Sequence, residues 1–402
     1  MNFNLVEMYN GLLRFNKHIL NELAEGLKHL PNLDGVSKGD SLIINEQGNP
    51  AWGSAAFIPP LDGSDGDVGV RVPEFYICVK DTGTKYQLWI SDFNIDGTFT
   101  RVHPFIISHT KTMTRTREDG KEEVFSACIK HDDTRYLGGN KSSSVVATKL
   151  QGRPRTGINY DKANEFCANR GDWITMIDYL EYCAIQALCY IEYANFDNQA
   201  ALNTNLTSDG FKQGGLGAGV TNLAWNRWTA FNGNNPIVQT YWTAEHNIGN
   251  GSTNGDHYEL GNYNTDGSNL NTYPAVYRGI LNFFGDIWTF IRDVVIVNRN
   301  ANYNSVYLLK KGVNHADITI DNIQDKCYFI GDQANSNNFI TEFDFRFGPY
   351  FIPNKVGTNK KADYNWIRGN NGQDTDKAVR VLLLGGCATS GSAAGSGYFN
   401  SN

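Results

Sequence analysis

The chain has 402 residues, of which 41% are apolar and 19% are charged, and its formal net charge is −7. This length and composition predict a soluble globular protein with one large core and smaller appendages. The acidic balance argues against a nucleic-acid partner, because no basic stripe is present to neutralise phosphates. The high numbers of glycine (41), tyrosine (20) and phenylalanine (22) favour a loop-rich, β-rich binding protein over a helical one.

Seven cysteines are scattered through the chain, mostly within apolar runs, and their spacing fits no zinc site. We expect them to be buried thiols, which pack as small hydrophobic side chains. The sequence starts without the basic segment and apolar core of a signal peptide, and no apolar run approaches the about 18 residues of a membrane span. These features predict synthesis in a cytoplasm, no membrane insertion, and release by a route such as lysis if the protein acts outside a cell.

Residues 1–31 are predicted to form an oligomerising helix. Apolar residues fall at heptad a and d positions: Leu5, Met8, Leu12, Phe15 and Ile19. Pro31 ends the pattern. An isolated helix of this length needs a surface on which to bury its apolar stripe, so the pattern favours self-association as a trimer. Docking of the helix on the chain's own globular domain is the alternative.

Residues 32–68 are predicted to be a short hairpin followed by a linker. Residues 40–52 alternate as two strands around a turn at Gln47-Gly48-Asn49. Residues 53–67 contain Pro59 and Pro60 with several glycines and aspartates, which is typical of a linker.

Residues 69–150 are predicted to be an antiparallel β region. Period-two alternation indicates strands over residues 75–79, 86–90 and 103–108. Asp119-Gly120 is typical of a two-residue hairpin turn, which predicts a hairpin over residues 117–124. Basic and acidic residues alternate there, so we expect the hairpin to be solvated and not to bind phosphate.

Two helices are predicted next. Residues 160–169 place Ala163, Phe166 and Cys167 on one face, and Gly171 ends that helix. Thr175-Met-Ile-Asp178 is a capping box that predicts a long helix to about Tyr193. The intervening Arg170-Gly-Asp172 matches an adhesion tripeptide, but helix capping already explains its glycine and aspartate.

No metal or cofactor is predicted. The histidines at 103, 109 and 131 are irregularly spaced and lack a partner motif. Residues 262–267 match the opening of a calcium-binding loop, but Tyr273 stands where that loop needs a glutamate. A plain turn is therefore expected, and a calcium site built from Asp256, Glu259 and Asp266 is the alternative. Residues 195–271 form a long loop segment whose tryptophans, including Trp225 and Trp242, favour order.

The largest apolar cluster lies in residues 276–293, and it is expected to be the centre of the core. Its bulky side chains are Ile280, Phe283, Phe284, Ile287, Trp288, Phe290 and Ile291. Gly279 and Gly285 supply the backbone freedom needed to bend the segment. A second apolar stretch, residues 380–386, is expected to be a strand.

These two stretches resemble a known family. Gly285-Asp-Ile-Trp-Thr-Phe290 resembles the Gly-Asn-Val-Trp-Glu-Trp core of C-type-lectin-like domains of the formylglycine-generating-enzyme type, and Arg380-Val-Leu-Leu-Leu-Gly-Gly386 resembles the strand that pairs with it. Tyr277-Arg-Gly-Ile280 and Phe351-Ile-Pro353 resemble the versions carried by bacteriophage fibre and receptor-binding proteins, some of which are diversified by retroelements. Strand, glycine-turn and tryptophan units similar to residues 40–52 occur in phage fibre shafts.

The resemblance implies an α+β fold in which residues 151–402 form a C-type-lectin-like domain with two helices and loop-rich antiparallel strands. The N-terminal helix and the hairpin shaft would precede it. Such domains normally close with a strand ending in Ile-Gly-x-Arg, whereas this sequence reads Tyr398-Phe-Asn-Ser-Asn402 there. Either the domain closes differently or the closing segment is missing from this chain, so the resemblance does not by itself imply an intact binding face or retroelement-directed variability.

The function implied is that of a virion fibre protein, on the tail or the head, that binds a host-cell-surface glycan or protein. Other virion proteins and further copies of the chain, as a homotrimer, would be its partners. Aromatic anchors at Tyr364 and Trp366 suit a recognition face. The expected ligand-binding residues are Asp363, Tyr364, Asn365, Trp366, Arg368, Asn370, Asn371, Cys387, Ser390, Tyr398 and Asn400.

Two other functions remain open. Formylglycine-generating enzymes use a pair of cysteines late in the domain, and only Cys387 lies near that position, so no catalytic residue and no enzyme is predicted. A structural decoration protein that binds no host molecule is the nearer alternative, because a lectin-like fold does not specify its ligand. The sugar-binding calcium motifs Glu-Pro-Asn, Gln-Pro-Asp and Trp-Asn-Asp are absent.

Overall fold

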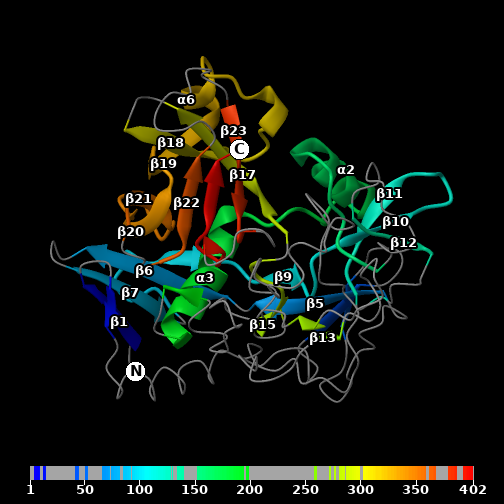
Figure 1. The fold of residues 1–402 in the computed structure, drawn as a ribbon, viewed down its shortest axis with the longest axis horizontal. Coiled ribbons are helices and arrows are strands. Elements are labelled where there is room, and N and C mark those ends of the chain that lie inside the picture. The colour runs from blue at the N-terminus through cyan, green and yellow to red at the C-terminus, as the bar shows by residue number, and fades with distance from the viewer. Residues whose placement is uncertain are drawn as a thin grey trace.

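The protein is a mixed, strand-rich α+β structure, as predicted (Figure 1). A computed structural model describes residues 4–9, 12–14, 41–44, 50–52, 66–72, 74–81, 85–91, 93–127, 129, 134–139, 152–193, 196–198, 258–259, 271–272, 276–277, 280–285, 287–298, 302–358, 362–367, 379–386 and 393–401. Over these residues the strands form six sheets, the largest of which has eight strands.

Two sheets of the N-terminal part share a bent ribbon. The first has the order β2-β1-β7-β6-β8, with β1 at Asn4–Tyr9, β2 at Leu12–Arg14, β6 at Phe75–Asp81, β7 at Lys85–Ser91 and β8 at Thr100–Val102. The second has the order β4-β3-β5-β9, with β3 at Ser41–Ile44, β4 at Pro50–Trp52, β5 at Asp67–Val72 and β9 at Phe105–Ser108. Val72 pairs with Phe105 in one sheet, and Phe75 pairs with Val102 in the other. Both strands of the ribbon therefore pass from sheet to sheet, and the predicted strands in this region are confirmed.

The N-terminal helix expected over residues 1–31 is wrong where the structure describes that segment. β1 pairs antiparallel with β7, from Asn4 opposite Ile90 to Tyr9 opposite Lys85, and β2 pairs with β1. A strand edge offers a row of backbone hydrogen-bond donors and acceptors, and the six residues of β1 pair with those along the edge of β7. Long-range pairing thus overrides a heptad pattern that has little stability without a partner helix. Residues 15–40, with Phe15, Ile19 and Pro31, lie outside the described residues.

The predicted hairpin at residues 40–52 is confirmed. Leu42 lies opposite Trp52 and Ile44 opposite Pro50. β3 also pairs with β5, so the hairpin continues into the second sheet. Asp67, predicted as the end of a linker, is instead the buried first residue of β5. The reason is that its carboxylate has a buried partner far along the chain. Residues 53–65 lie outside the described part.

A third sheet, in the order β11-β10-β12, packs against the first long helix. Its strands are β10 at Met113–Thr116, β11 at Glu122–Phe125 and β12 at Tyr136–Leu137. Gly120 has φ 81°, which suits the predicted turn between β10 and β11. The helix, α2 at Tyr160–Arg170, starts at Asn159, whose side chain accepts from Lys162 N at 2.9 Å, and it ends at Gly171. Its predicted buried face is confirmed.

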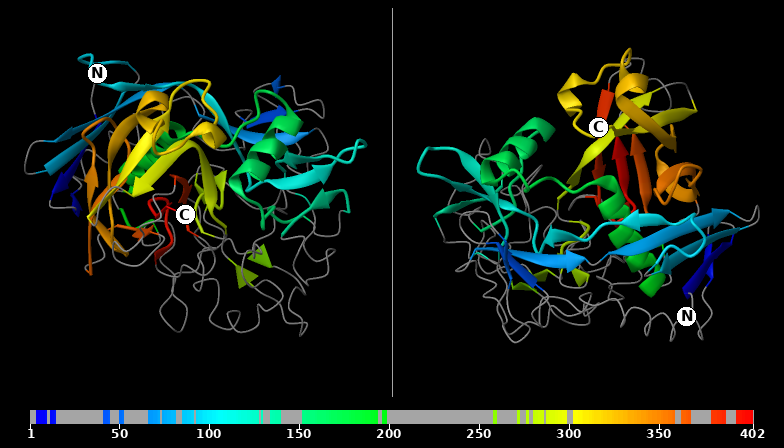
Figure 2. Two further views of the ribbon diagram at one scale, coloured as in Figure 1. Left: turned by 90° about the horizontal axis from the view of Figure 1, so that it is seen from above. Right: turned by 180° about the vertical axis from the view of Figure 1, so that it is seen from behind.

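The second long helix, α3 at Tyr179–Tyr193, lies below the eight-stranded sheet and beside the first sheet (Figures 1 and 2). The predicted capping box at residues 175–178 is three residues too early. Asp178 is the capping residue, and its N–H donates to the Glu181 carboxylate at 3.0 Å. Side chains from Tyr182 to Ile191 are buried. Among the described residues, no helix is long and apolar enough to cross a membrane.

The eight-stranded sheet has the order β19-β18-β17-β23-β24-β22-β20-β21. Its strands are β17 at Thr289–Asn298, β18 at Tyr303–Leu309, β19 at Cys327–Ala334, β20 at Asn338–Asp344, β21 at Ile352–Gly357, β22 at Tyr364–Ile367, β23 at Val379–Leu384 and β24 at Phe399–Ser401. The predicted pairing of the two apolar stretches is confirmed, because Thr289 lies opposite Leu384 and Phe290 opposite Leu383. β24 runs parallel to β22 and antiparallel to β23 in the middle of the sheet.

The remaining elements are two two-stranded sheets, β13-β14 and β15-β16, and two short helices. They are β13 at Tyr258–Glu259, β14 at Asn271–Thr272, β15 at Val276–Tyr277, β16 at Ile280–Leu281, η5 at His315–Asp317 and α6 at Ile323–Lys326. Helix α6 and its flanks cover one end of a face of the eight-stranded sheet, where Ile318 and Ile323 pack on Val295 and Val297.

The predicted core segment is confirmed in part. Ile280, Phe283, Phe284 and Ile291 are buried, and Gly285 has φ 77° at the bend. Ile287, Trp288 and Phe290 are only half-buried. They were expected in the core because of their size, but the chain turns them towards a cavity. The cysteines at 78, 167, 183, 189 and 327 are buried free thiols, as predicted, and Cys128 and Cys387 lie outside the described residues.

Candidate binding site

One face of the eight-stranded sheet carries a row of side chains that crosses four neighbouring strands. Trp366 of β22 pairs with Asn400 of β24. Asn400 pairs with Leu383 of β23, and Leu383 pairs with Phe290 of β17. Residues directly opposite each other share a face of a sheet, so these four side chains follow one line across it.

Aromatic rings continue this face beside β22. Tyr364 lies two residues before Trp366 and therefore on the same face. Its ring centroid is 5.6 Å from that of Tyr398 and 5.2 Å from that of Phe339. The ring of Trp288 approaches Tyr398 to 4.6 Å. We call Trp288, Tyr398, Tyr364 and Phe339 the aromatic row; all but Tyr398 are half-buried.

Two of the expected ligand-binding residues are internal, which corrects their role. The Asp363 carboxylate is fully buried and accepts from Gly397 N at 2.8 Å. A Cβ added at Gly395 would lie 2.0 Å from that carboxylate, so Asp363 fills the space left by a glycine. Asn365 is also fully buried, because it alternates with Tyr364 and Trp366 along β22 and so faces the core. It donates to Ala334 O at 2.9 Å and to Ser336 O at 2.8 Å.

Tyr398 and Asn400 are buried as well, but they lie on the face just described. Tyr398 joins the rings of Trp288 and Tyr364, and Asn400 lines the cavity described below. They are therefore placed as parts of the site wall and not as exposed contacts. The remaining expected residues lie outside the described part of the chain: Arg368, Asn370, Asn371, Cys387 and Ser390.

A cavity of about 1230 Å³ opens where this face meets the third sheet and α2. The sheet contributes Phe290, Val381, Leu383 and Asn400 to its wall. Residues of β9, β10 and α2 form the opposite wall, and Figure 1 shows α2 and β10 on the other side of the molecule from the eight-stranded sheet. Trp288 belongs both to the cavity wall and to the aromatic row, so the cavity and the row are continuous.

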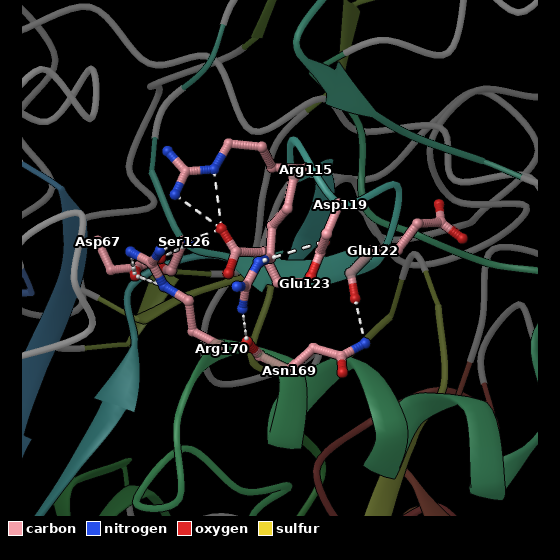
Figure 3. Close-up of polar contacts among 9 residues, drawn as sticks. Asp67, Arg115, Asp119, Glu122, Glu123, Ser126, Asn169 and Arg170 are labelled. Carbon is pink, nitrogen blue, oxygen red and sulfur yellow. Dashed lines mark hydrogen bonds and ion pairs between the residues drawn. The ribbon is translucent and has the colours of Figure 1, made fainter.

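The wall formed by α2 contains a buried cluster of charges (Figure 3). Arg170 donates to one Asp67 carboxylate oxygen from Nε at 2.8 Å and from Nη2 at 2.6 Å. Its Nη1 reaches Glu123 at 3.2 Å, and Arg115 donates to the same Glu123 oxygen at 3.0 Å and 2.7 Å. Only 1% of the Arg170 side chain is exposed, so the tripeptide at 170–172 presents no arginine for adhesion.

The hairpin between β10 and β11 is therefore not simply solvated, as was expected. Glu123 is buried because it alternates inward along β11, and Arg115 stands opposite it in register. Burial raises the pKa of Asp67 to about 6, although Arg170 and the Ser126 N–H both favour its charged form. The charged side chains of this wall pair with one another, and these pairs hold α2 against the third sheet.

A second buried acid, Asp293, lies at the start of α3. Its Oδ1 accepts from Tyr179 N at 2.8 Å. Burial, and then the nearby charge of Asp178, raise the pKa of Asp293 to about 7. Arg292 pairs with Asp178 through two contacts of 2.6 Å. Asp293 does not line the cavity, so we assign it to capping α3 and not to chemistry on a ligand.

Among the described residues, no group of three or more His, Cys, Asp or Glu side chains gathers as metal ligands. The residues that sequence reasoning missed are Asp67, Arg170, Thr110 and Asn282 in the cavity wall. The sequence pointed only to Asp67, which follows a segment rich in proline and glycine. The others could not be found from the sequence, because the register between distant strands decides which residues come together. Comparison with known proteins adds no assignment: the sequence matches no protein-family model, and no curated protein is detectably similar to it.

Proposed function

We propose that the protein is a receptor-binding protein of a bacteriophage virion, a tail or head fibre component that attaches to a host-cell-surface glycan or protein through a C-type-lectin-like domain. The motif resemblances at residues 285–290 and 380–386 support this proposal, together with their pairing in one sheet. Two long helices followed by a strand-rich C-terminal part are the element order expected of that domain.

The observation that carries the proposal is the aromatic row beside Trp366. Trp288, Tyr364, Phe339 and Trp366 are half-buried, so they keep part of each side chain accessible while the sheet fixes their positions. Tyrosine and tryptophan concentrate binding energy because they bring a large amphipathic surface at low entropic cost. A rigid strand face is also a more exact support than a loop.

The test is binding of the purified protein to host cells with Tyr364 and Trp366 both changed to alanine. We expect this double variant to lose cell binding, because both anchors leave the same face. Its melting temperature should fall by only a few degrees, since both side chains are half-buried.

The matched control changes two other exposed aromatic residues, Tyr328 and Phe347, to alanine; these side chains are 60% and 53% exposed. That variant should bind cells like the parent. Equal binding by all three proteins would place recognition elsewhere. A parent protein that binds no cell in a host panel would favour the non-adhesive decoration protein.

Trimer formation remains a prediction for such a fibre, but the first residues of the N-terminal heptad pattern no longer support it. β1 and β2 are strands, so the heptad pattern does not supply a coiled coil over residues 4–9 and 12–14. Light scattering of the purified chain decides the point: a monomer mass at micromolar concentration would refute the trimer without touching the aromatic row.

A further inference from the structure

We propose that the free edge of β9 docks an extended, uncharged segment of a separate polypeptide. The segment would add a strand to the four-stranded sheet and place its apolar side chains in the cavity. This inference goes beyond the proposed function, because it concerns the N-terminal ribbon and does not depend on binding to host cells. Three observations carry it: an open backbone edge, exposed apolar side chains beside that edge, and wall charges that are already paired.

The backbone of β9 has one edge without a partner strand. β9 is the last strand of the sheet β4-β3-β5-β9. His109 N donates to Val68 O at 3.0 Å, one position beyond the pair of Ser108 with Gly69. Hydrogen-bonded and non-bonded pairs alternate along an antiparallel ladder, so the N–H and C=O groups of Ser108 and Ile106 point away from β5. Among the described residues, no backbone hydrogen bond reaches these outer groups.

This edge is accessible and borders the cavity. None of the four residues of β9 is buried, and Ile106 is 36% exposed. All four line the cavity. Successive side chains of a strand point to opposite faces of the sheet, so a cavity against one face would contact only alternate residues. Contact with all four indicates that the edge of β9 is turned towards the cavity.

Accessible apolar side chains gather around the edge. Four large hydrophobic residues of the described chain are exposed, and two of them, Ile106 and Trp173, line the cavity. The wall residues Ile287, Phe290 and Val381 are half-buried, so they also keep accessible surface. Contiguous apolar surface of this kind marks binding sites. The cavity volume of about 1230 Å³ exceeds the roughly 300–1,000 Å³ that is usual for small-molecule sites, which leaves room for several side chains.

The charged groups of the wall pair within the protein, which favours an uncharged segment. Arg170 pairs with both Asp67 and Glu123. Arg155 lies 3.6 Å from Glu122. An ionic partner would have to compete for these groups, whereas an uncharged peptide leaves them in place.

An extended peptide is the occupant that uses both the edge and the apolar walls. A free apolar molecule would cover the walls but leave the outer N–H and C=O groups of β9 to water. An added strand supplies backbone partners to the edge and directs alternate side chains into the cavity. Natural proteins commonly protect exposed edges with lysine or proline, and β9 reads Phe-Ile-Ile-Ser, without either.

The test uses the full-length protein and a library of peptides of about eight residues, within the usual length of a strand. In each peptide threonine alternates with valine, isoleucine, leucine, phenylalanine or tyrosine. We expect at least one peptide to bind and to change the tryptophan fluorescence, because Trp173 and Trp288 line the cavity. The tightest peptide is then made with N-methyl groups on the amides of one edge or of the other. Methylation of the edge that pairs with β9 should weaken binding about tenfold, and methylation of the opposite edge should not.

Two matched protein variants locate the site. Ile106→Asp places a charge on the free edge, and we expect it to weaken binding of the tightest peptide about tenfold. Its melting temperature should stay within a few degrees of the parent, because Ile106 is exposed. Phe347→Asp is the control: Phe347 is 53% exposed and does not line the cavity, so this variant should bind the peptide like the parent. The N-methyl comparison uses the unchanged protein and decides the point even if Ile106→Asp does not fold.

Several outcomes would overturn the inference. It is wrong if no peptide binds, if the two N-methylated forms bind alike, or if Ile106→Asp binds like Phe347→Asp. Palmitate serves as a free apolar probe, and its binding without any peptide binding would assign the cavity to a small apolar ligand. A dimer of the pure chain that Ile106→Asp dissociates would place a second copy of the chain on β9 in place of a separate partner. None of these results depends on cell binding, so the receptor-binding function is decided separately.

Discussion

The two walls of the cavity are held by different forces. The α2 wall is fixed by Arg170, Asp67 and Glu123, whose charges are buried and paired at 2.6–3.2 Å. The sheet wall is fixed by apolar packing behind it, where Leu382, Leu384 and Phe399 join the main core. A buried charge requires its partner in one geometry, while apolar packing tolerates small changes in shape. The α2 wall should therefore be the more sensitive to single substitutions.

The largest effect should come from Arg170→Ala. The change leaves the Asp67 and Glu123 carboxylates buried without their common partner, and we expect a loss of about 3–5 kcal/mol in the free energy of unfolding. Urea denaturation followed by tryptophan fluorescence measures it.

The control for Arg170 is Lys355→Ala, which removes a surface ion pair of 2.7 Å, similar in length to the 2.6 Å pair of Arg170 with Asp67. Both of its side chains are more than a third exposed, so we expect almost no change in stability. Similar losses in the two variants would mean that burial of the Arg170 cluster has no energetic weight.

The pH dependence of stability should come next in size. The pKa of Asp293 is about 7 in the folded protein, against about 4 in an unfolded chain. Between these values the folded state binds more protons than the unfolded state, so this residue lowers stability as the pH rises from 4 to 7. One group contributes a slope of at most about 1.4 kcal/mol per pH unit.

Asp293→Asn removes that titration and keeps an oxygen for the Tyr179 N–H. We expect the variant to show a flatter fall in stability between pH 4 and pH 7 than the parent. Asp67, with its pKa raised to about 6, acts in the same direction below pH 6 and remains in both proteins. Superimposable stability curves for parent and variant would show that Asp293 is ionised throughout that range.

Trp288 tests the sheet wall. Trp288→Ala should cost about 1–2 kcal/mol, because a half-buried side chain loses only part of the burial energy of a core residue. Phe284→Ala, three residues past the β16 strand and fully buried, should cost about 3–5 kcal/mol. The sequence alone places both side chains in the core, so thermal or urea unfolding of both variants separates a cavity residue from a core residue.

Local patterns predicted much of the fold. Capping and turn residues identified α2, α3 and the hairpin at Gly120, and the apolar stretches identified β17 and β23. The N-terminal helix failed because a heptad pattern does not show that an open strand edge at β7 is available. Asp363 and Asn365 failed as contacts because only the register of β22 shows which of its residues face the core. The cavity could not be predicted, since its walls come from segments more than 200 residues apart, such as β9 and β23.

The smallest effect should come from the cap of α3, which lies between the two walls. The Asp178 N–H donates to the Glu181 carboxylate, so Glu181→Ala leaves one helix-end donor without that acceptor. We expect a loss of about 0.5–1 kcal/mol, within the range for single capping contacts. Glutamine serves a capping box as glutamate does. Glu181→Gln should therefore retain most of the stability, and it also removes a carboxyl group whose pKa is raised by burial. Urea unfolding at pH 7 compares the two variants. If glutamine lost as much stability as alanine, the charge of Glu181 and not its hydrogen bond would stabilise the start of α3.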